Sequence, residues 1–291
     1  KSIAVIGAGA IGVEFSYYFN SLGSKVTLFE LMDRIVPIED EDSSAELTKA
    51  FKKQGIEVNT SAKIEKVENT GKGVKVTYTR KDETKTLEAD YALVAVGIQG
   101  NVEDLGLEKL GVKVDRSFIP VDGYGRTNIE GIYAIGDVAG PPALAHKASH
   151  EALACVEKIA GHDVPPFSKD VIPGCTYSQP QIASVGLTEK QARDKGFNVK
   201  VGKFIFKPLG KAIAIGETDG FVKLVFDAKH GQLLGGHIVH AEATELISEV
   251  VLGLDVESTI HTLTRAVHPH PTLSEAIMEA AAVAGGECVH Q

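Results

Sequence analysis

A glycine-rich turn near the beginning of the chain constrains its fold more than any other feature. The β-branched run at residues 3–6 is followed by the sequence GAGAIG at positions 7–12, and a helix-like segment then continues to Gly23. In this pattern the first glycine permits a tight turn, the second lets a pyrophosphate approach the backbone, and the third allows close packing of helix on strand. Unpaired N–H groups at the helix start face the anion. The turn therefore predicts a Rossmann-like dinucleotide-binding unit.

An acidic residue after the next apolar run indicates which dinucleotide binds. Glu30 follows a predicted strand over residues 25–29 and stands 18 residues after Gly12. A carboxylate there can accept hydrogen bonds from both ribose hydroxyls and repels a 2′-phosphate, so we predict NAD rather than NADP. The competing interpretation is an ordinary glycine turn followed by a solvated glutamate. The order of strand, turn and helix favours the nucleotide site.

The first part of the chain is predicted to form a parallel sheet with a small antiparallel attachment. A helix over residues 43–53 leads to a third strand over 56–59. Alternating apolar residues between 62 and 91 then predict an antiparallel meander. The continuous apolar run over 91–96 is typical of a strand buried on both faces. We expect this first domain to cover residues 1–98.

The rest of the chain changes character twice. Residues 99–166 contain short, turn-rich segments with one strand over 132–135 and one helix over 145–159, and we expect them to be too broken to form a core of their own. Over 167–291 strands precede helices, which favours an α+β domain. The strands are predicted over 181–185, 200–206, 221–226 and 233–238, and the helices over 189–195, 243–253, 256–263 and 273–284.

Composition narrows the classes of protein. The 291 residues suggest about two domains. A net charge of −9, spread along the chain, argues against nucleic-acid binding. No apolar stretch approaches the roughly 20 residues of a membrane-spanning helix, and Lys1 leads directly into a strand-like run, which suggests a fragment without a signal peptide. We therefore expect a soluble globular protein without membrane partners.

Three cysteines are widely separated along the chain. Cys155, Cys175 and Cys288 form neither a CxxC pair nor a Cys/His metal cluster. We predict ordinary buried thiols, no metal site and a reducing compartment, namely the cytoplasm of a bacterium or, as the alternative, a mitochondrial matrix.

A histidine near the end of the chain carries the sharpest chemistry. His270 lies between two prolines, and Glu275 follows within reach of an imidazole nitrogen. A carboxylate on one ring nitrogen fixes the tautomer and raises the basicity of the other, which can then take a proton from a thiol. Two alternatives stay open: Thr272 and Glu275 also fit a capping box, and His268 with His270 also fits a metal pair.

Taken together, four motifs resemble the pyridine nucleotide-disulfide oxidoreductases: GAGAIG at 7–12, YAIGD at 133–137, LAHKASHEA at 144–152 and HPTLSE at 270–275. The resemblance covers nearly the whole chain. It implies an α/β protein with a Rossmann-like NAD-binding domain over 1–98, part of a central FAD-binding domain over 99–166 and an α+β dimerisation domain over 167–291. Two of the motifs, YAIGD and LAHKASHEA, match the family's segments that contact FAD.

The resemblance also assigns roles to residues. His270 and Glu275 would be an acid/base pair that serves a disulfide on the other subunit of a homodimer. Asp137 would bind the ribityl chain of FAD, with Leu144, Ala145 and His146 against the flavin. The NAD site would combine the glycine turn and Glu30 with three further residues; its members are Gly7, Gly9, Ala10, Ile11, Gly12, Glu14, Glu30, Ala62 and Gly97.

The implied activity is that of an NAD-dependent flavoprotein disulfide oxidoreductase. It would oxidise dihydrolipoamide carried by lipoyl domains of 2-oxo acid dehydrogenase or glycine cleavage complexes, and pass electrons through a disulfide and FAD to NAD+. The family's second GxGxxG and its redox-active Cys-x-x-x-x-Cys are not in this sequence, so we expect a C-terminal portion that is inactive alone.

Two alternatives to this activity remain. The first is another NAD(P)-disulfide reductase of the family, although Glu30 disfavours NADPH-dependent glutathione reductase and the single tail cysteine Cys288 disfavours mercuric reductase. The second is a catalytically silent NAD-binding and dimerisation module. The loop after Gly97 also departs from the family, because it reads IQGN at 98–101 where many members have Arg-Arg-Pro-Asn.

Overall fold

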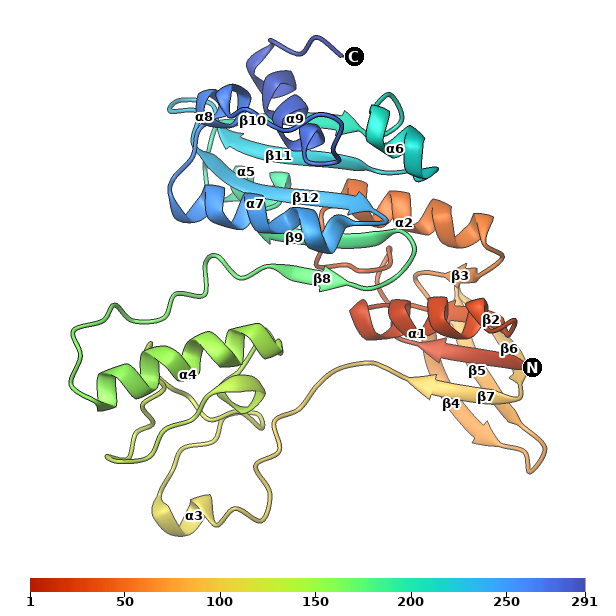
Figure 1. Ribbon diagram of the computed structural model, residues 1–291. Coiled ribbons are helices and arrows are strands. Elements are labelled where there is room, and N and C mark those ends of the chain that lie inside the picture. The colour runs from red at the N-terminus through yellow and green to blue at the C-terminus, as the bar shows by residue number, and fades with distance from the viewer. Residues whose placement is uncertain (291) are drawn as a thin grey trace. The chain divides into compact units, whose positions relative to one another are not determined.

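The computed structural model describes residues 1–290 (Figure 1). These residues form two compact units. One unit combines Lys1–Val96 with the chain from Pro173 onward, and the other is Gly97–Ile172. The predicted domain boundaries after residues 98 and 166 lie close to these divisions and remain predictions.

The first strands form a parallel sheet in the order β3-β2-β1-β7. It is built from β1 (Ser2–Ile6), α1 (Ala10–Ser21), β2 (Lys25–Phe29), α2 (Glu41–Lys53), β3 (Glu57–Asn59) and β7 (Tyr91–Val94). Val5 and Leu28 are fully buried in its core, as are Leu47 and Phe51 from α2. The predicted unit of strand, crossover helix and parallel strand is therefore confirmed, as expected for apolar strands separated by an amphipathic helix.

A three-stranded antiparallel sheet is attached to this one, as predicted. Its strands are β4 (Lys63–Asn69), β5 (Val74–Arg80) and β6 (Glu83–Ala89). The sheet packs through Val76, which is fully buried, and through Tyr78, whose ring centroid lies 4.8 Å from that of Phe29. The prediction for residues 91–96 was wrong in one respect: β7 is an edge strand, so Tyr91, Val94 and Val96 are exposed and not buried on both faces.

The C-terminal part contains a five-stranded antiparallel sheet in the order β10-β11-β12-β9-β8. Its strands are β8 (Gly174–Thr176), β9 (Gln181–Gly186), β10 (Val199–Ile205), β11 (Phe221–Asp227) and β12 (Leu233–His240). Its helices are α5 (Glu189–Asp194), α6 (Gly210–Ile215), α7 (Ala243–Asp255), α8 (Ile260–Arg265) and α9 (Glu275–Gly285). Strands and helices combine as an α+β domain, as the sequence predicted.

Three details of this part differ from the sequence-based expectation. The short elements β8 and α6 were not predicted. Helix α8 begins at Ile260 rather than at residue 256, because Glu257 adopts a φ of 54° and Thr259 caps the helix through the N–H of Thr262. A residue in the left-handed region interrupts a helix, so the apolar periodicity alone placed the start too early.

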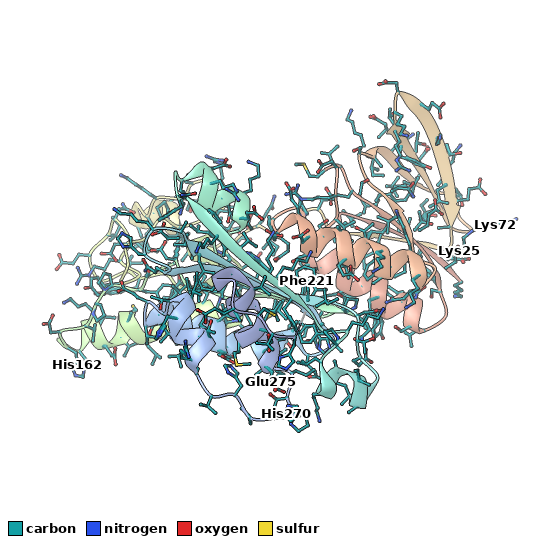
Figure 2. The ribbon with its side chains drawn as sticks, turned by 90° about the horizontal axis from the view of Figure 1, so that it is seen from above. Lys25, Lys72, His162, Phe221, His270 and Glu275 are labelled. Carbon is teal, nitrogen blue, oxygen red and sulfur yellow. The ribbon has the colours of Figure 1, made fainter. Side chains whose placement is uncertain are left out.

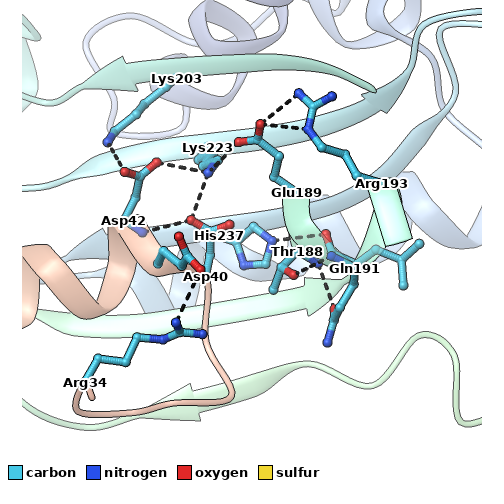
Figure 3. Close-up of polar contacts among 12 residues, drawn as sticks. Arg34, Asp40, Asp42, Thr188, Glu189, Gln191, Arg193, Lys203, Lys223 and His237 are labelled. Carbon is cyan, nitrogen blue, oxygen red and sulfur yellow. Dashed lines mark hydrogen bonds and ion pairs between the residues drawn. The ribbon is translucent and has the colours of Figure 1, made fainter. Parts of the chain in front are cut away.

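A buried lysine links the two stretches of the first unit (Figure 3). The Nζ atom of Lys223, on β11, lies 2.9 Å from both Asp40 Oδ1 and Asp42 Oδ2 and 3.0 Å from Glu189 Oε2. Asp40 also caps α2, since its side chain accepts from the N–H of Asp42. Burial works to lower the pKa of Lys223, but the three carboxylates outweigh it and raise that pKa. The lysine is therefore charged and paired at neutral pH.

The unit Gly97–Ile172 contains α3 (Leu107–Leu110), the 3-10 helix η1 (Gly136–Ala139) and α4 (Ala145–Ile159). The helix predicted over 145–159 is confirmed. The strand predicted over 132–135 is wrong: only Tyr133 forms a bridge, with Arg126, and Gly136 at a φ of 76° turns the chain into η1. The expectation that this segment lacks a core is also wrong, because a small buried cluster contains Leu107, Val112, Ile119 and Ala134.

Candidate functional site

The glycine turn between β1 and α1 has the geometry that its sequence requires. Gly7 has a φ of 96°, and a Cβ on it would lie 2.4 Å from the Ala95 carbonyl oxygen. A Cβ on Gly12 would lie 1.8 Å from the Gly7 carbonyl oxygen, so helix α1 packs directly on the turn. A Cβ on Gly9, in contrast, would meet no atom of residues 1–290 within 4 Å. Neighbouring backbone atoms thus leave no room for a side chain at the first and third glycines, whereas the second glycine borders open space.

The start of helix α1 is suited to an anion. Gly9 is its N-cap and supplies no side-chain hydrogen bond, so the first N–H groups of the helix remain available. Ala10 and Ile11 follow on the exposed first turn. Open space beside Gly9 and unpaired N–H groups together fit a pyrophosphate, which is the group that such a turn binds.

Glu30 lies at the end of β2 and is held against the turn. Its Oε2 accepts a hydrogen bond from the N–H of Ala8 at 2.7 Å, and its Oε1 accepts one from the N–H of Met32 at 2.9 Å. The N–H of Ala62 donates to the Glu30 carbonyl oxygen at 2.8 Å. Each carboxylate oxygen keeps a further lone pair, so the fixed carboxylate can still accept a hydroxyl hydrogen. The structure thus brings Glu30 and Ala62 together with the glycine turn.

Glu14, one turn into α1, points toward the start of the C-terminal part. Its Oε1 accepts a hydrogen bond from the N–H of Tyr177 at 2.8 Å. The last residue of the predicted NAD site, Gly97, is the first residue of the other unit, and a Cβ on it would meet no atom within 4 Å.

His270, in the segment between α8 and α9, lies beside Glu275, the first residue of α9 (Figure 2). The Nδ1 of His270 is 2.9 Å from Glu275 Oε1. Because a carboxylate only accepts, Nδ1 carries the proton and the neutral ring leaves a lone pair on Nε2. Within residues 1–290 no hydrogen bond reaches Nε2, and the His270 side chain is 77 % exposed. The ring can therefore take a proton from a group outside this chain.

Glu275 makes a contact that each of the two predicted interpretations requires. Its Oε2 accepts from the N–H of Thr272 at 2.8 Å while Oε1 binds His270. The Thr272 hydroxyl donates to the Pro269 carbonyl oxygen at 2.7 Å, so the reciprocal half of a capping box is not formed. Desolvation works to raise the pKa of Glu275, but the Thr272 N–H and His270 outweigh it and lower that pKa. Glu275 is therefore ionised at neutral pH and orients the imidazole.

The residues predicted to contact the flavin all belong to the unit Gly97–Ile172. Asp137 is exposed on η1, and Leu144 is the N-cap of α4, immediately before Ala145 and His146. No side-chain cap occupies the N-terminus of α4. An exposed carboxylate and an uncapped helix start are compatible with a polar ligand.

A buried ion pair, which was not predicted from the sequence, holds the backbone at Gly136, the first residue of η1. Lys147 Nζ lies 3.2 Å from Glu151 Oε1, and both side chains are buried. Lys147 also donates to the Gly136 carbonyl oxygen at 2.9 Å, while the Gly136 N–H donates to Glu151 Oε2 at 2.8 Å. The pair thus holds both polar groups of Gly136, the residue before Asp137. The sequence could have predicted this pair, because Lys147 and Glu151 are opposite charges four residues apart on a predicted helix.

The three cysteines are unsuited to nucleophilic chemistry in this structure. Burial is the largest cause that raises the pKa of Cys155, of Cys175 and of Cys288. Each thiol therefore stays protonated at neutral pH, and the thiolate is the reactive form. Across residues 1–290, no group of three or more His, Cys, Asp or Glu side chains could hold a metal ion, and no helix is long and apolar enough to cross a membrane.

Comparison with protein families gives two matches. A model described as "Pyridine nucleotide-disulphide oxidoreductase" matches residues 1–152. A model of the dimerisation domain of the same family matches residues 172–281. Together these matches cover the regions that carry the glycine turn, the flavin motifs and the His270 segment.

Individual relatives agree with these matches. Dihydrolipoyl dehydrogenases of Rhizobium etli and Zymomonas mobilis are 50 % and 49 % identical over the whole chain, which spans 61 % and 63 % of their lengths. Among solved structures, LpdA from Mycobacterium tuberculosis has a TM-score of 0.89 at 30 % identity, over 96 % of this chain and 61 % of that one. The flavoprotein disulfide reductase RclA from Escherichia coli has a TM-score of 0.89 at 26 % identity, over 97 % and 64 %.

Proposed function

The chain belongs to the pyridine nucleotide-disulphide oxidoreductase family, and we propose that it is the C-terminal part of a dihydrolipoyl dehydrogenase. The proposed activity is oxidation of protein-bound dihydrolipoamide with reduction of NAD+. The observation that carries it is the His270–Glu275 hydrogen bond of 2.9 Å, which leaves Nε2 of an exposed imidazole able to accept a proton. A dithiol must lose protons when it is oxidised, and this pair can take one.

The NAD site would be formed by the glycine turn, Glu30 and their neighbours. Open space at Gly9 and the uncapped start of α1 support binding of the pyrophosphate there. The Glu30 carboxylate, fixed by two backbone N–H groups, would accept the ribose hydroxyls and repel a 2′-phosphate. Glu14, Ala62 and Gly97 would line the remainder of the site.

FAD, once bound, would supply the hydride chemistry between the dithiol and NAD+. In this chain Asp137, Leu144, Ala145 and His146 would contact it. The buried pair of Lys147 and Glu151 would fix the Gly136 backbone and thereby orient Asp137.

The proposed protein works as a homodimer, in which each His270 serves a disulfide of the other subunit. The match of residues 172–281 to a dimerisation domain supports this arrangement. Two identical sites would then form at one two-fold interface. Its macromolecular partners would be the lipoyl domains of 2-oxo acid dehydrogenase or glycine cleavage complexes, in a bacterial cytoplasm or a mitochondrial matrix.

A substrate comparison on the full-length protein that carries this chain tests the proposal. We expect NAD+-dependent oxidation of dihydrolipoamide, and little reduction of oxidised glutathione with either NADH or NADPH. Rapid NADPH-dependent reduction of glutathione would contradict the assignment and favour another disulfide reductase of the family. The silent-module alternative applies to the 291-residue chain alone: stoichiometric flavin and lipoamide activity of that chain would refute it.

A further inference from the structure

The segment that carries His270 contains a second histidine–glutamate pair. His268 Nε2 lies 2.7 Å from Glu249 Oε1, and His268 Nδ1 lies 3.0 Å from the Ala266 carbonyl oxygen. The side chain of His268 is only 7 % exposed, compared with 77 % for His270. The His268 ring is thus buried against the protein, while the His270 ring faces solvent.

Both contacts of the His268 ring require a proton on the ring. A carboxylate and a backbone carbonyl are acceptors only, so both contacts are hydrogen bonds only when both ring nitrogens are protonated. The hydrogen bond to Glu249 is the largest influence on the pKa of His268 and raises it, against the opposing effect of burial. His268 is therefore an imidazolium whose charge is matched by Glu249.

The His268–Glu249 pair attaches the His270 segment to a neighbouring helix. Glu249 belongs to α7, whereas His268 lies in the irregular segment between α8 and α9. On the other side of His270, Thr272 is fixed by its bonds to Glu275 and Pro269. The candidate base is thus flanked by one attachment two residues before it and another two residues after it.

We propose that His268 and Glu249 are positioning residues, which hold the segment so that Nε2 of His270 meets the thiol from which it takes a proton. This inference rests on the proposed function of His270. His268 itself cannot serve as the base, because both of its nitrogens are engaged. Its attachment also explains why a buried histidine paired with a carboxylate lies two residues before an exposed one.

Few other charges act on His268. Among the described residues, the other charged group that acts on it besides Glu249 of α7 is Glu275 of α9, and His270 lies in the same segment. Arg265, at the end of α8, lies 4.0 Å from Glu287 instead. Removal of the Glu249 charge should therefore determine whether His268 keeps its proton.

The substitution Glu249→Gln keeps an acceptor oxygen and removes the charge. In the variant, His268 should titrate near the usual histidine pKa of about 6.5, and above that pH its charge-assisted hydrogen bond to position 249 is replaced by a weaker bond between neutral groups. We expect flavin reduction by dihydrolipoamide, in the full-length variant, to stay within about twofold of wild type at pH 6 and to be about tenfold slower at pH 8, as expected for a displaced base. Glu245→Gln, exposed one turn earlier on α7, is the matched control and should change neither rate.

Two further readouts separate positioning from general damage. Nitrogen NMR of histidine-labelled chain should find His268 protonated on both ring nitrogens at pH 8, and titrating in Glu249→Gln. Electron transfer from NADH to an artificial acceptor does not require His270 and should be unchanged. Equal slowing of this reaction and of thiol oxidation would overturn the positioning role.

The same experiments distinguish failure of this inference from failure of the proposed function. If His270→Gln abolishes thiol oxidation while Glu249→Gln matches wild type at both pH values, only the positioning role is refuted. If His270→Gln has no effect, the proposed function of His270 fails, whatever Glu249→Gln does. A His268 that titrates normally in the wild-type chain would also overturn the positioning role.

Discussion

The glycine turn and the His270 segment are two candidate sites built in opposite ways. The turn is made of backbone: Gly7 and Gly12 lack side chains because neighbouring carbonyl oxygens occupy that space, and Gly9 borders open space. The His270 segment is made of side chains, in which two histidine–glutamate pairs fix an irregular stretch of chain. The first would bind its ligand through open backbone, and the second would act through paired charges. Substitutions should therefore affect them differently.

The largest expected effect is on proton transfer. In the full-length protein, His270→Gln should slow dihydrolipoamide oxidation by about 100- to 10,000-fold, the usual contribution of a general base. NADH binding should not change, because the glycine turn contains no part of this segment. Steady-state rates and fluorescence titrations of NADH measure the two quantities. The exposed His162, replaced by Gln, is the control and should alter neither. If His270→Gln lowered NADH affinity as much as it lowered the oxidation rate, the two sites would not be independent, and the prediction would be wrong.

The next effect concerns stability. Lys223 and its three carboxylates join Lys1–Val96, which carries the glycine turn, to the chain from Pro173 onward, which carries His270. Lys223→Met should lower the free energy of unfolding by about 3–5 kcal/mol, because it leaves the buried Asp40 carboxylate without its partner. Chemical denaturation gives this value. Lys190→Met, which removes an exposed ion pair with Asp194, should cause no measurable change. Equal stability of the two variants would mean that the buried lysine contributes nothing.

The pH dependence of this network has a definite sign. Desolvation works to raise the pKa of Asp42, but Lys223 and Lys203 outweigh it and lower that pKa. Its contribution to stability is therefore present above the unfolded Asp pKa of about 3.9 and is lost as the pH falls through the lower folded value. As the pH is lowered from 6 to 3, the denaturant concentration at the unfolding midpoint should consequently fall more steeply for wild type than for Lys223→Met.

The glycines of the turn offer a matched pair. Gly12→Ala should destabilise the protein by about 1–3 kcal/mol or more, because its Cβ would collide with the Gly7 carbonyl oxygen. Gly9→Ala meets no protein atom within 4 Å and should leave the thermal midpoint nearly unchanged, yet weaken NADH binding about tenfold. Unaltered NADH affinity in Gly9→Ala would show that the nucleotide does not approach this backbone.

The last expected effect is on cofactor preference. Glu30→Gln should lower NADH affinity by about tenfold, since a hydrogen bond to a charged group contributes roughly 1.5–3 kcal/mol, and should narrow the gap between NADH and NADPH. The neighbouring exposed Glu57, replaced by Gln, serves as the control. An unchanged ratio of the two affinities in Glu30→Gln would exclude Glu30 as the determinant.

The two regions also differ in how far the sequence predicts them. The glycine turn, the following helix and Glu30 obey local rules of spacing, so strand, helix and acidic residue were all found from sequence. His270 and Glu275 are five residues apart and were found too. Glu249 is 19 residues from His268, however, and Asp40 is 183 residues from Lys223. Such partners depend on how distant elements pack, which no local pattern contains.

The errors have the same origin. Residues 132–135 have a strand-like sequence, but they pair only through Tyr133 and turn at Gly136. Val94 and Val96 are apolar, yet they lie at a sheet edge and are exposed. Apolar sequence indicates that a segment favours burial; whether it is buried depends on what packs against it.

The most direct test of the proposed NAD site is a fluorescence titration of the purified 291-residue chain with NADH and NADPH, without flavin or substrate. We predict saturable binding of NADH and at least about tenfold weaker binding of NADPH, because Glu30 would repel a 2′-phosphate. Equal affinity for the two nucleotides, or no binding of NADH, would contradict it.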